Sequence, residues 1–164
     1  MLALPLLALL SLAVGPRAFS DESAYAPLWL YQGTWQSRTT GREKIDRIAN
    51  QCKIVGTYFA CQQSVNEKLA SLIVFVPRET PGAYYVQGVL PDGRAAGRAE
   101  LNIDGDHWTY QSSDQEGGKT TFYRTTNLFT GKNRIHFEQS ESPDGQHWMI
   151  TGSGDESRLG AAEP

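Results

Sequence analysis

The sequence predicts an all-β fold: a closed antiparallel up-and-down barrel of about ten strands with a short N-terminal helix. Runs of five to nine β-forming residues recur beyond Gly33, and turn-forming residues separate them. Each connection is too short for a crossover helix, so neighbouring strands are expected to be antiparallel. Because no amphipathic helix is available to cover a sheet face, closure into a barrel is the expected way to hide the strand edges.

Length and charge restrict the class of protein. The chain has 164 residues, a formal net charge of -3, and 40% hydrophobic and 20% charged residues. This size suits one domain, and the composition is that of an ordinary globular protein. The slightly acidic balance argues against a protein whose main role is to bind nucleic acid, because that role requires a basic surface.

The N-terminus has the character of a signal peptide. Residues 1–14 are almost wholly apolar, and this run is shorter than the about 20 residues that span a bilayer. Small residues at Ala18 and Ser20 predict cleavage after Ser20, so the expected signal peptide is residues 1–20. No basic residue precedes the apolar run, which indicates either a start placed a few residues late or a weak signal. An amphipathic or buried N-terminal helix is the alternative interpretation. We therefore expect an exported protein, periplasmic or secreted, with no membrane span.

The rest of the chain divides into three parts. Residues 21–32 form an N-terminal segment with a short helix, residues 33–157 form the barrel, and residues 158–164 form a disordered tail. The expected strands are 33–40, 44–55, 57–66, 69–77, 83–90, 97–103, 107–114, 119–128, 134–141 and 147–154.

The two cysteines predict a disulfide. If Gly56-Thr57 forms a two-residue hairpin turn, Cys52 lies directly opposite Cys61, which is within reach of a bridge. An even number of cysteines in an exported domain favours this pairing over two reduced core thiols.

Folding each hairpin about its turn places one apolar and aromatic set of side chains on a common face. We interpret this face as the barrel interior, whereas the opposite face is polar and carries all three histidines, His107, His136 and His147. The predicted interior residues are Ile54, Phe59, Ile73, Phe75, Tyr84, Val86, Leu101, Trp108, Tyr110, Tyr123, Phe137, Trp148 and Ile150.

Two predicted strands, 69–77 and 83–90, place apolar residues on the outer face, which is otherwise polar. Leu72, Val74 and Tyr85 belong to an outward apolar stripe, and such a stripe is usually covered. The two candidate covers are the segment 25–31, folded back as a short helix, and a second copy of the protein in a homodimer.

Three short motifs carry a family resemblance. They are Gly33-Thr34-Trp35, which opens the first strand, and two DGxHW hairpins at 104–108 and 144–148. With these motifs the chain resembles the lipocalin and wider calycin barrels, and more closely a family of small exported bacterial lipocalin-like barrels of unknown function. The resemblance covers about residues 28–157. It implies a fold and no particular activity.

The favoured function is non-catalytic binding of a small hydrophobic, partly apolar or aromatic molecule in the lumen. An aromatic cup with a few fixed polar groups is typical of small-molecule pockets. The predicted walls are Trp108, Tyr110, Tyr123, Phe137 and Trp148, the polar anchors are Asn50, Thr125 and Asn127, and Asp46 is the one inward carboxylate. No cofactor and no metal are expected.

Other functions compete with this one. The main alternative is a protein-interaction or self-associating module that uses the outer stripe Leu72/Val74/Tyr85 while side chains plug the barrel. A lumen enzyme would use Asp46 with a lumen tyrosine. A haem barrel similar to the nitrobindins shares the GTW start and the strand count, but it requires an inward histidine and the register places none there.

Overall fold

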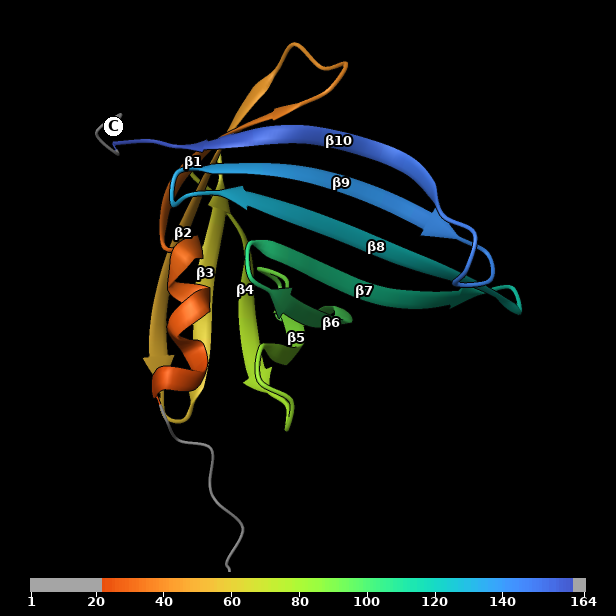
Figure 1. Ribbon diagram of the computed structural model, residues 1–164, viewed down its shortest axis with the longest axis horizontal. Helices are drawn as coiled ribbons and strands as arrows, with labels where there is room; N and C mark the ends of the chain where they lie inside the picture. Colours follow the sequence, from red (N-terminus) through yellow and green to blue (C-terminus); the bar gives the residue numbers. More distant parts are fainter. Residues whose placement is uncertain (1–21, 161–164) are drawn as a thin grey trace, which may run out of the picture.

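A computed structural model describes residues 22–160 and shows a closed barrel of ten antiparallel strands preceded by one 3-10 helix (Figure 1). The predicted fold class is therefore confirmed. In the described part of the chain, no helix is both long and apolar enough to cross a membrane. The expected signal peptide, residues 1–20, and the last four residues of the expected tail lie outside the described residues.

The strands follow one another around the barrel in chain order, and β10 closes it by pairing with β1. The helix and strands are η1 (Glu22–Tyr31), β1 (Gly33–Thr39), β2 (Ile45–Val55), β3 (Tyr58–Val65), β4 (Lys68–Pro77), β5 (Ala83–Val89), β6 (Ala95–Asp104), β7 (His107–Glu116), β8 (Lys119–Thr130), β9 (Arg134–Ser142) and β10 (Met149–Arg158). In this order, the turns after β2, β4, β6 and β8 share one end of the barrel, which we call the floor. The other turns surround the mouth. Because β10 runs to Arg158, the last strand continues one residue beyond the predicted barrel boundary.

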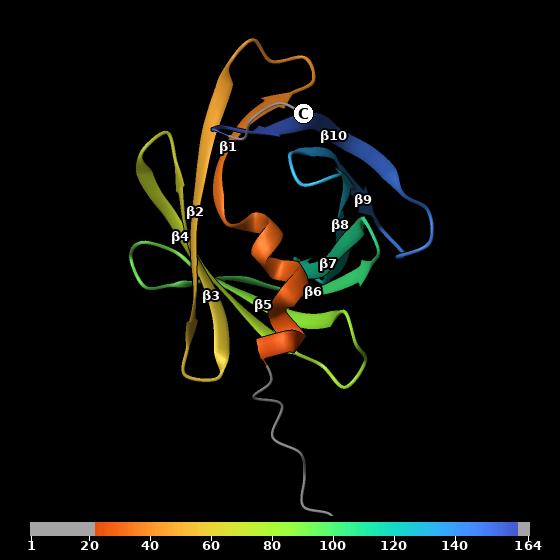
Figure 2. The same cartoon turned by 60° about the vertical axis from the view of Figure 1, so that its left-hand side comes forward.

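Helix η1 enters the barrel and closes its floor (Figure 2). Leu28 has no solvent exposure and belongs to the core. The Tyr25 hydroxyl donates to the carbonyl of Thr57 in the β2–β3 turn (2.7 Å), and the Tyr84 hydroxyl donates to the carbonyl of Ala24 (2.5 Å). The idea that this segment covers the outer stripe is therefore wrong, because its apolar side chains gain more burial among the inward aromatic residues.

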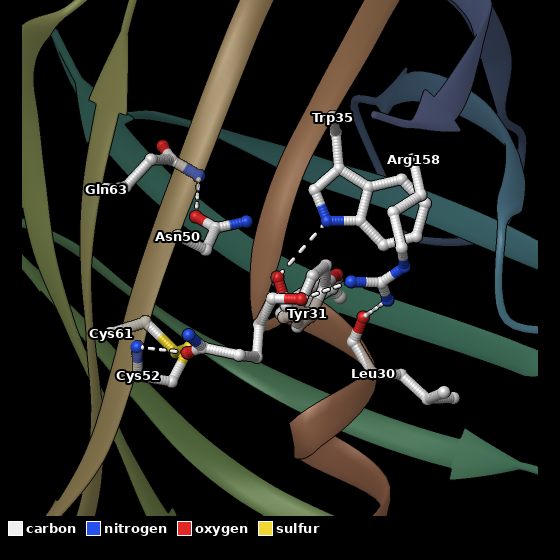
Figure 3. The surroundings of a disulfide bond; sticks show 10 residues. Leu30, Tyr31, Trp35, Asn50, Cys52, Cys61, Gln63 and Arg158 are labelled. Carbon is white, nitrogen blue, oxygen red and sulfur yellow. Dashed lines mark hydrogen bonds between the residues drawn. A yellow bond between two sulfur atoms is a disulfide. The ribbon is translucent and has the colours of Figure 1, made fainter. Parts of the chain in front are cut away.

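A clamp from the last strand fixes the end of η1 (Figure 3). The Arg158 guanidinium lies 4.2 Å over the Trp35 ring and donates to the carbonyls of Leu30, Gln32 and Lys132. Gly33 leaves room for it: its φ is +119°, and a Cβ atom there would lie 2.7 Å from Arg158 Nη1. The glycine of the GTW motif is thus required both by its backbone conformation and by the close guanidinium.

Most inward faces follow the prediction. Phe59, Phe75, Leu101 and Trp108 are all buried in the core. Pairing in several hairpins differs by two residues; for example, Leu101 lies opposite Tyr110 instead of Trp108. A shift of two residues leaves each side chain on its predicted face, because the alternation along a strand has period two.

Strand β10 is the exception, and two residues predicted to lie in the interior lie outside it. Ser140 lies opposite Ile150 and Gln139 opposite Gly152, so Thr151 is an extra residue that reverses the alternation. As a result Ile150 points outward and is 62% exposed. Trp148 precedes the strand, and its ring packs 4.2 Å from the Arg124 guanidinium, which lies on the outer face. The interior placement of Trp148 and Ile150 is therefore wrong.

The second DGxHW motif explains this error. The Asp144 carboxylate accepts hydrogen bonds from the backbone N–H groups of Gln146 (2.8 Å) and His147 (2.9 Å). These bonds hold residues 143–148 in a compact loop and delay the start of β10, whereas in the first motif Asp104 pairs directly with His107 across a tight turn.

The predicted disulfide is confirmed. Cys52 lies opposite Cys61 in the β2–β3 hairpin, and their sulfur atoms are bonded. The bond lies beside the end of η1, where the Gln32 side chain accepts a hydrogen bond from the Cys52 backbone (2.6 Å) (Figure 3). It therefore ties together two strands that also hold the entering helix.

The wall has one partly open seam, between β6 and β7. Pairing of these strands extends from Asp104 and His107 only to Glu100 and Gln111, although both strands continue toward the mouth. A hollow of about 440 Å³ lies at this seam, and Ala99 lines both this hollow and the lumen. The seam therefore adjoins the interior.

Candidate ligand-binding lumen

The lumen above η1 contains a cavity of about 270 Å³. Its wall is mostly aliphatic and aromatic, and among the described residues that line it none is charged. The lining residues are Tyr31, Asn50, Cys61, Gln63, Ile73, Phe75, Val86, Gly88, Gly97, Ala99 and Tyr110. A dry apolar cavity of about 150 Å³ can hold benzene, so this one has room for a molecule of one or two rings.

Two tyrosine hydroxyls meet in the lumen. Tyr31, the last residue of η1, accepts a hydrogen bond from the Tyr110 hydroxyl (2.9 Å) and another from the Asn127 amide nitrogen (2.8 Å). Burial raises the pKa of both tyrosines, so both hydroxyls stay protonated near neutral pH. The Tyr31 ring makes edge-to-face contacts with the rings of Trp108 and Phe129, at 5.1 Å and 6.1 Å between ring centroids.

A second polar pair comes from β2 and β3. The Gln63 side chain donates to the Asn50 side-chain oxygen (3.1 Å) (Figure 3). Asn50 is only 5% exposed and lines the cavity. Its amide nitrogen does not take part in the hydrogen bond to Gln63, so it can donate to a molecule in the cavity.

Trp108 forms part of the floor beneath the tyrosines. It is 1% exposed and packs against Phe129 at 4.6 Å as well as against Tyr31. Its indole N–H is buried and finds no acceptor among residues 22–160. The interior thus holds a buried unsatisfied donor next to the Tyr31 ring.

The interior also contains a carboxylate that the sequence reasoning missed. Glu156 faces inward from β10, opposite Ser37 and Ile135. Burial raises its pKa, and a hydrogen bond from Ser37 partly offsets this effect. The expected strand ended at residue 154, which left Glu156 out; the alternation from Gly152 through Gly154 was the signal that could have found it.

The predicted site residues separate into three groups. The first group lies at the cavity: Asn50 and Tyr110 line it, and Asn127 and Trp108 contact Tyr31 from behind. The second group, Thr125 and Phe137, faces inward, opposite Tyr110 and Asn127 respectively, but outside the cavity lining. The structure thus brings only part of the predicted wall together.

The third group lies away from the cavity. Tyr123 faces inward opposite Ser112, but it is 39% exposed on the long extension of β7–β10 past the seam. Asp46 lies opposite Ser37, and its carboxylate binds Asn66 (2.6 Å) and Lys44 (3.1 Å), which lower its pKa. These two residues, like Trp148 on the outer face, do not line the cavity.

The histidines lie outside, as the register predicts. The side chains of His107, His136 and His147 are between 48% and 85% exposed. His136 and His147 pair with the outer carboxylates of Asp155 and Asp144. They are the only histidines of the chain, so a haem barrel with an inward axial histidine does not fit this arrangement.

Tyr31 is the central residue that sequence reasoning missed. From the sequence, its segment, 25–31, is one of two candidate covers of the outer apolar stripe. Asn127 and Tyr110, two side chains with polar groups that the register predicts to face the same lumen, require a hydrogen-bond partner there, and that requirement is the available signal.

Comparisons with known proteins support the fold. No family model matches the chain, and no curated protein matches it. Among solved structures, the crystal structure of Rv2717c from M. tuberculosis is similar, with a TM-score of 0.50 and 12% sequence identity over 83% of this chain and 97% of that chain. At this identity the likeness concerns the barrel fold alone.

Proposed function

We propose that the protein is an exported lipocalin-like barrel that binds a small, partly apolar or aromatic molecule in its lumen without transforming it. One observation carries the proposal: an uncharged cavity of about 270 Å³ with a mainly apolar wall and a few convergent polar side chains. Pockets of this character are typical of small-molecule sites. Export is supported by the disulfide, because such bonds persist in oxidising compartments.

A cavity-filling variant tests the binding proposal. Ala99 lines the cavity, so Ala99→Phe places a ring in the space that the ligand would occupy. The matched control is Ala95→Phe, because Ala95 is exposed near the start of the same strand. Calorimetric titration with indole should give binding in the wild type and the control and none in Ala99→Phe, with circular dichroism confirming that each variant folds. Binding that survives in a folded Ala99→Phe variant would place the ligand elsewhere.

Self-association is the second candidate function. An outer groove of about 460 Å³ crosses β2–β4 and includes Leu72 and Val74, and Leu72 is 42% exposed. Tyr85, the third residue of the predicted stripe, is instead covered by the guanidinium groups of Arg78 and Arg98, 4.9 and 4.7 Å from its ring centre. The apolar surface available to a second copy is therefore on the β2–β4 side.

Sedimentation at increasing protein concentration tests this alternative. Dimerisation through the groove should be lost in Leu72→Asp and retained in Met149→Asp, which places a charge at an exposed position on β10. Monomer at every concentration would dismiss the alternative. The minority idea of a lumen enzyme gains no support, because Asp46 is engaged with Asn66 and Lys44 away from the tyrosine pair.

A further inference from the structure

Several hydrogen-bond donors of the lumen have a hydrogen that no acceptor of the described chain uses. In the tyrosine pair, the Asn127 amide nitrogen donates to Tyr31, and one hydroxyl donates to the other. With Asn127 in this orientation, one O–H hydrogen of the pair has no acceptor among the described residues, whichever hydroxyl donates. Since both tyrosines line the cavity, that hydrogen is available to a bound molecule.

The amide pair leads to the same result. Asn50 and Gln63 together have four N–H groups and two oxygens, and their mutual hydrogen bond uses one N–H group and one oxygen lone pair. In either orientation of the amides, three N–H groups remain that this bond does not use.

The charge of the lining limits the ligand further. No cationic side chain is among the described residues that line the cavity, so an anion there would have no counter-charge. A ligand with only donor groups would leave the spare O–H and N–H groups unsatisfied. A neutral molecule with an acceptor oxygen meets both conditions.

We propose, on the basis of the proposed lumen-binding function, that the ligand is a neutral, ring-sized molecule with a carbonyl oxygen. The apolar wall of Ile73, Phe75 and Val86 holds its ring, and the oxygen accepts hydrogen bonds from the tyrosine pair and Asn50. The tyrosines and Asn50 are thus the specificity-determining residues.

Matched probes test this assignment. Acetophenone and α-methylstyrene have nearly the same shape, but only acetophenone has a carbonyl oxygen. The ratio of their dissociation constants is measured in the wild type and in the double variant Tyr31→Phe/Tyr110→Phe. Comparing the two ratios cancels the difference between the free energies of removing the two probes from water. Removing the hydroxyls should weaken acetophenone relative to α-methylstyrene by roughly three- to tenfold. The control Tyr58→Phe, which removes an exposed outer hydroxyl, should leave the ratio unchanged.

An infrared measurement keeps the test valid if the double variant does not fold. The carbonyl stretch of acetophenone bound to the wild-type protein should lie below its frequency in hexane, because hydrogen bonds weaken the C=O bond. Benzoate should bind at least tenfold more weakly than acetophenone at pH 7, because its charge would be buried without a partner.

The outcomes separate the two proposals. If both neutral probes bind but the carbonyl frequency equals that in hexane, or the ratio is the same in a folded double variant, the lumen binds ligands without the proposed recognition. Tight benzoate binding would overturn the neutral class. If none of the probes binds, the proposed function fails as well.

Discussion

A single methyl group added at Gly154 should destabilise the barrel strongly. Gly154 lies inside β10, between β1 and the Phe137 ring of β9, and its φ is not in the left-handed region, so conformation alone does not require glycine. A Cβ atom there would lie 2.3 Å from the carbonyl oxygen of Arg38 and 2.6 Å from Phe137 Cζ. An ordinary van der Waals contact begins at 3.4 Å, so the added methyl group must be separated from both neighbours by about 1 Å more.

The magnitude follows from which partner has to move. The Arg38 carbonyl belongs to a strand paired on both sides, so it cannot retreat without disturbing the β1–β10 closure. Overpacking of this kind costs about 1–3 kcal/mol, and the upper part of that range applies when backbone is displaced. Alanine also reduces the conformational entropy of the unfolded chain, and this offsets the cost by about 0.4–1 kcal/mol. We expect Gly154→Ala to lower the free energy of unfolding by about 2 kcal/mol and Tm by about 6 °C.

Gly152 supplies the matched control. It precedes Gly154 on the same face of β10, but a Cβ atom there would meet only the end of the flexible Gln139 side chain, at 3.3 Å. Gly152→Ala should therefore stay within about 0.5 kcal/mol of the wild type. Urea and thermal unfolding followed by circular dichroism measure both variants. Equal effects of the two substitutions, or none at Gly154, would refute the packing argument.

Three further perturbations have defined outcomes. Reducing Cys52–Cys61 should lower the free energy of unfolding by about 2–3 kcal/mol, because the bridge restricts the unfolded chain and the loop that it closes is short. Denaturant titrations with and without reductant measure this change, and identical titrations would contradict the stabilising role of the bridge. Arg158→Ala should cost about 2–3 kcal/mol through loss of the Trp35 contact and the carbonyl bonds, and Arg158→Lys should recover less than half, because lysine lacks the planar fork. Glu156 has a pKa raised by burial, so ionisation opposes folding: wild-type stability should fall as pH rises from the ordinary value of 4.5 through the raised pKa. Glu156→Gln should remove that decline, and an identical pH profile in the variant would contradict the assignment.

A structural element could be predicted from the sequence where local interactions determine it. The hairpins, the disulfide and the inward faces of the early strands follow from local alternation and turn chemistry, so they could be predicted. Two features depend on information that alternation does not contain. The extra residue Thr151 reverses the face of β10 and moves Trp148 outside, and the capped loop at Asp144 differs from the tight turn at Asp104 despite the shared motif.

The candidate site shows the same division. Asn50 and Tyr110 were found because they belong to regular strands with a continuous register. Tyr31 was missed because its position depends on where a separate helix docks, and an apolar segment can be buried equally well on either side of a sheet. Its assignment became possible only when the buried partners around it were known.

The clamp at Arg158 has a consequence for how the chain folds. The guanidinium reaches carbonyls that precede it by 126 and 128 residues, and β1 finds its second neighbour only in β10. The end of η1 and the outer edge of β1 therefore gain these contacts only when β10 has formed. Contacts so distant along the chain slow the search for the native topology, so we expect ring closure to be the late step and β1 and β10 to be unpaired edges until then.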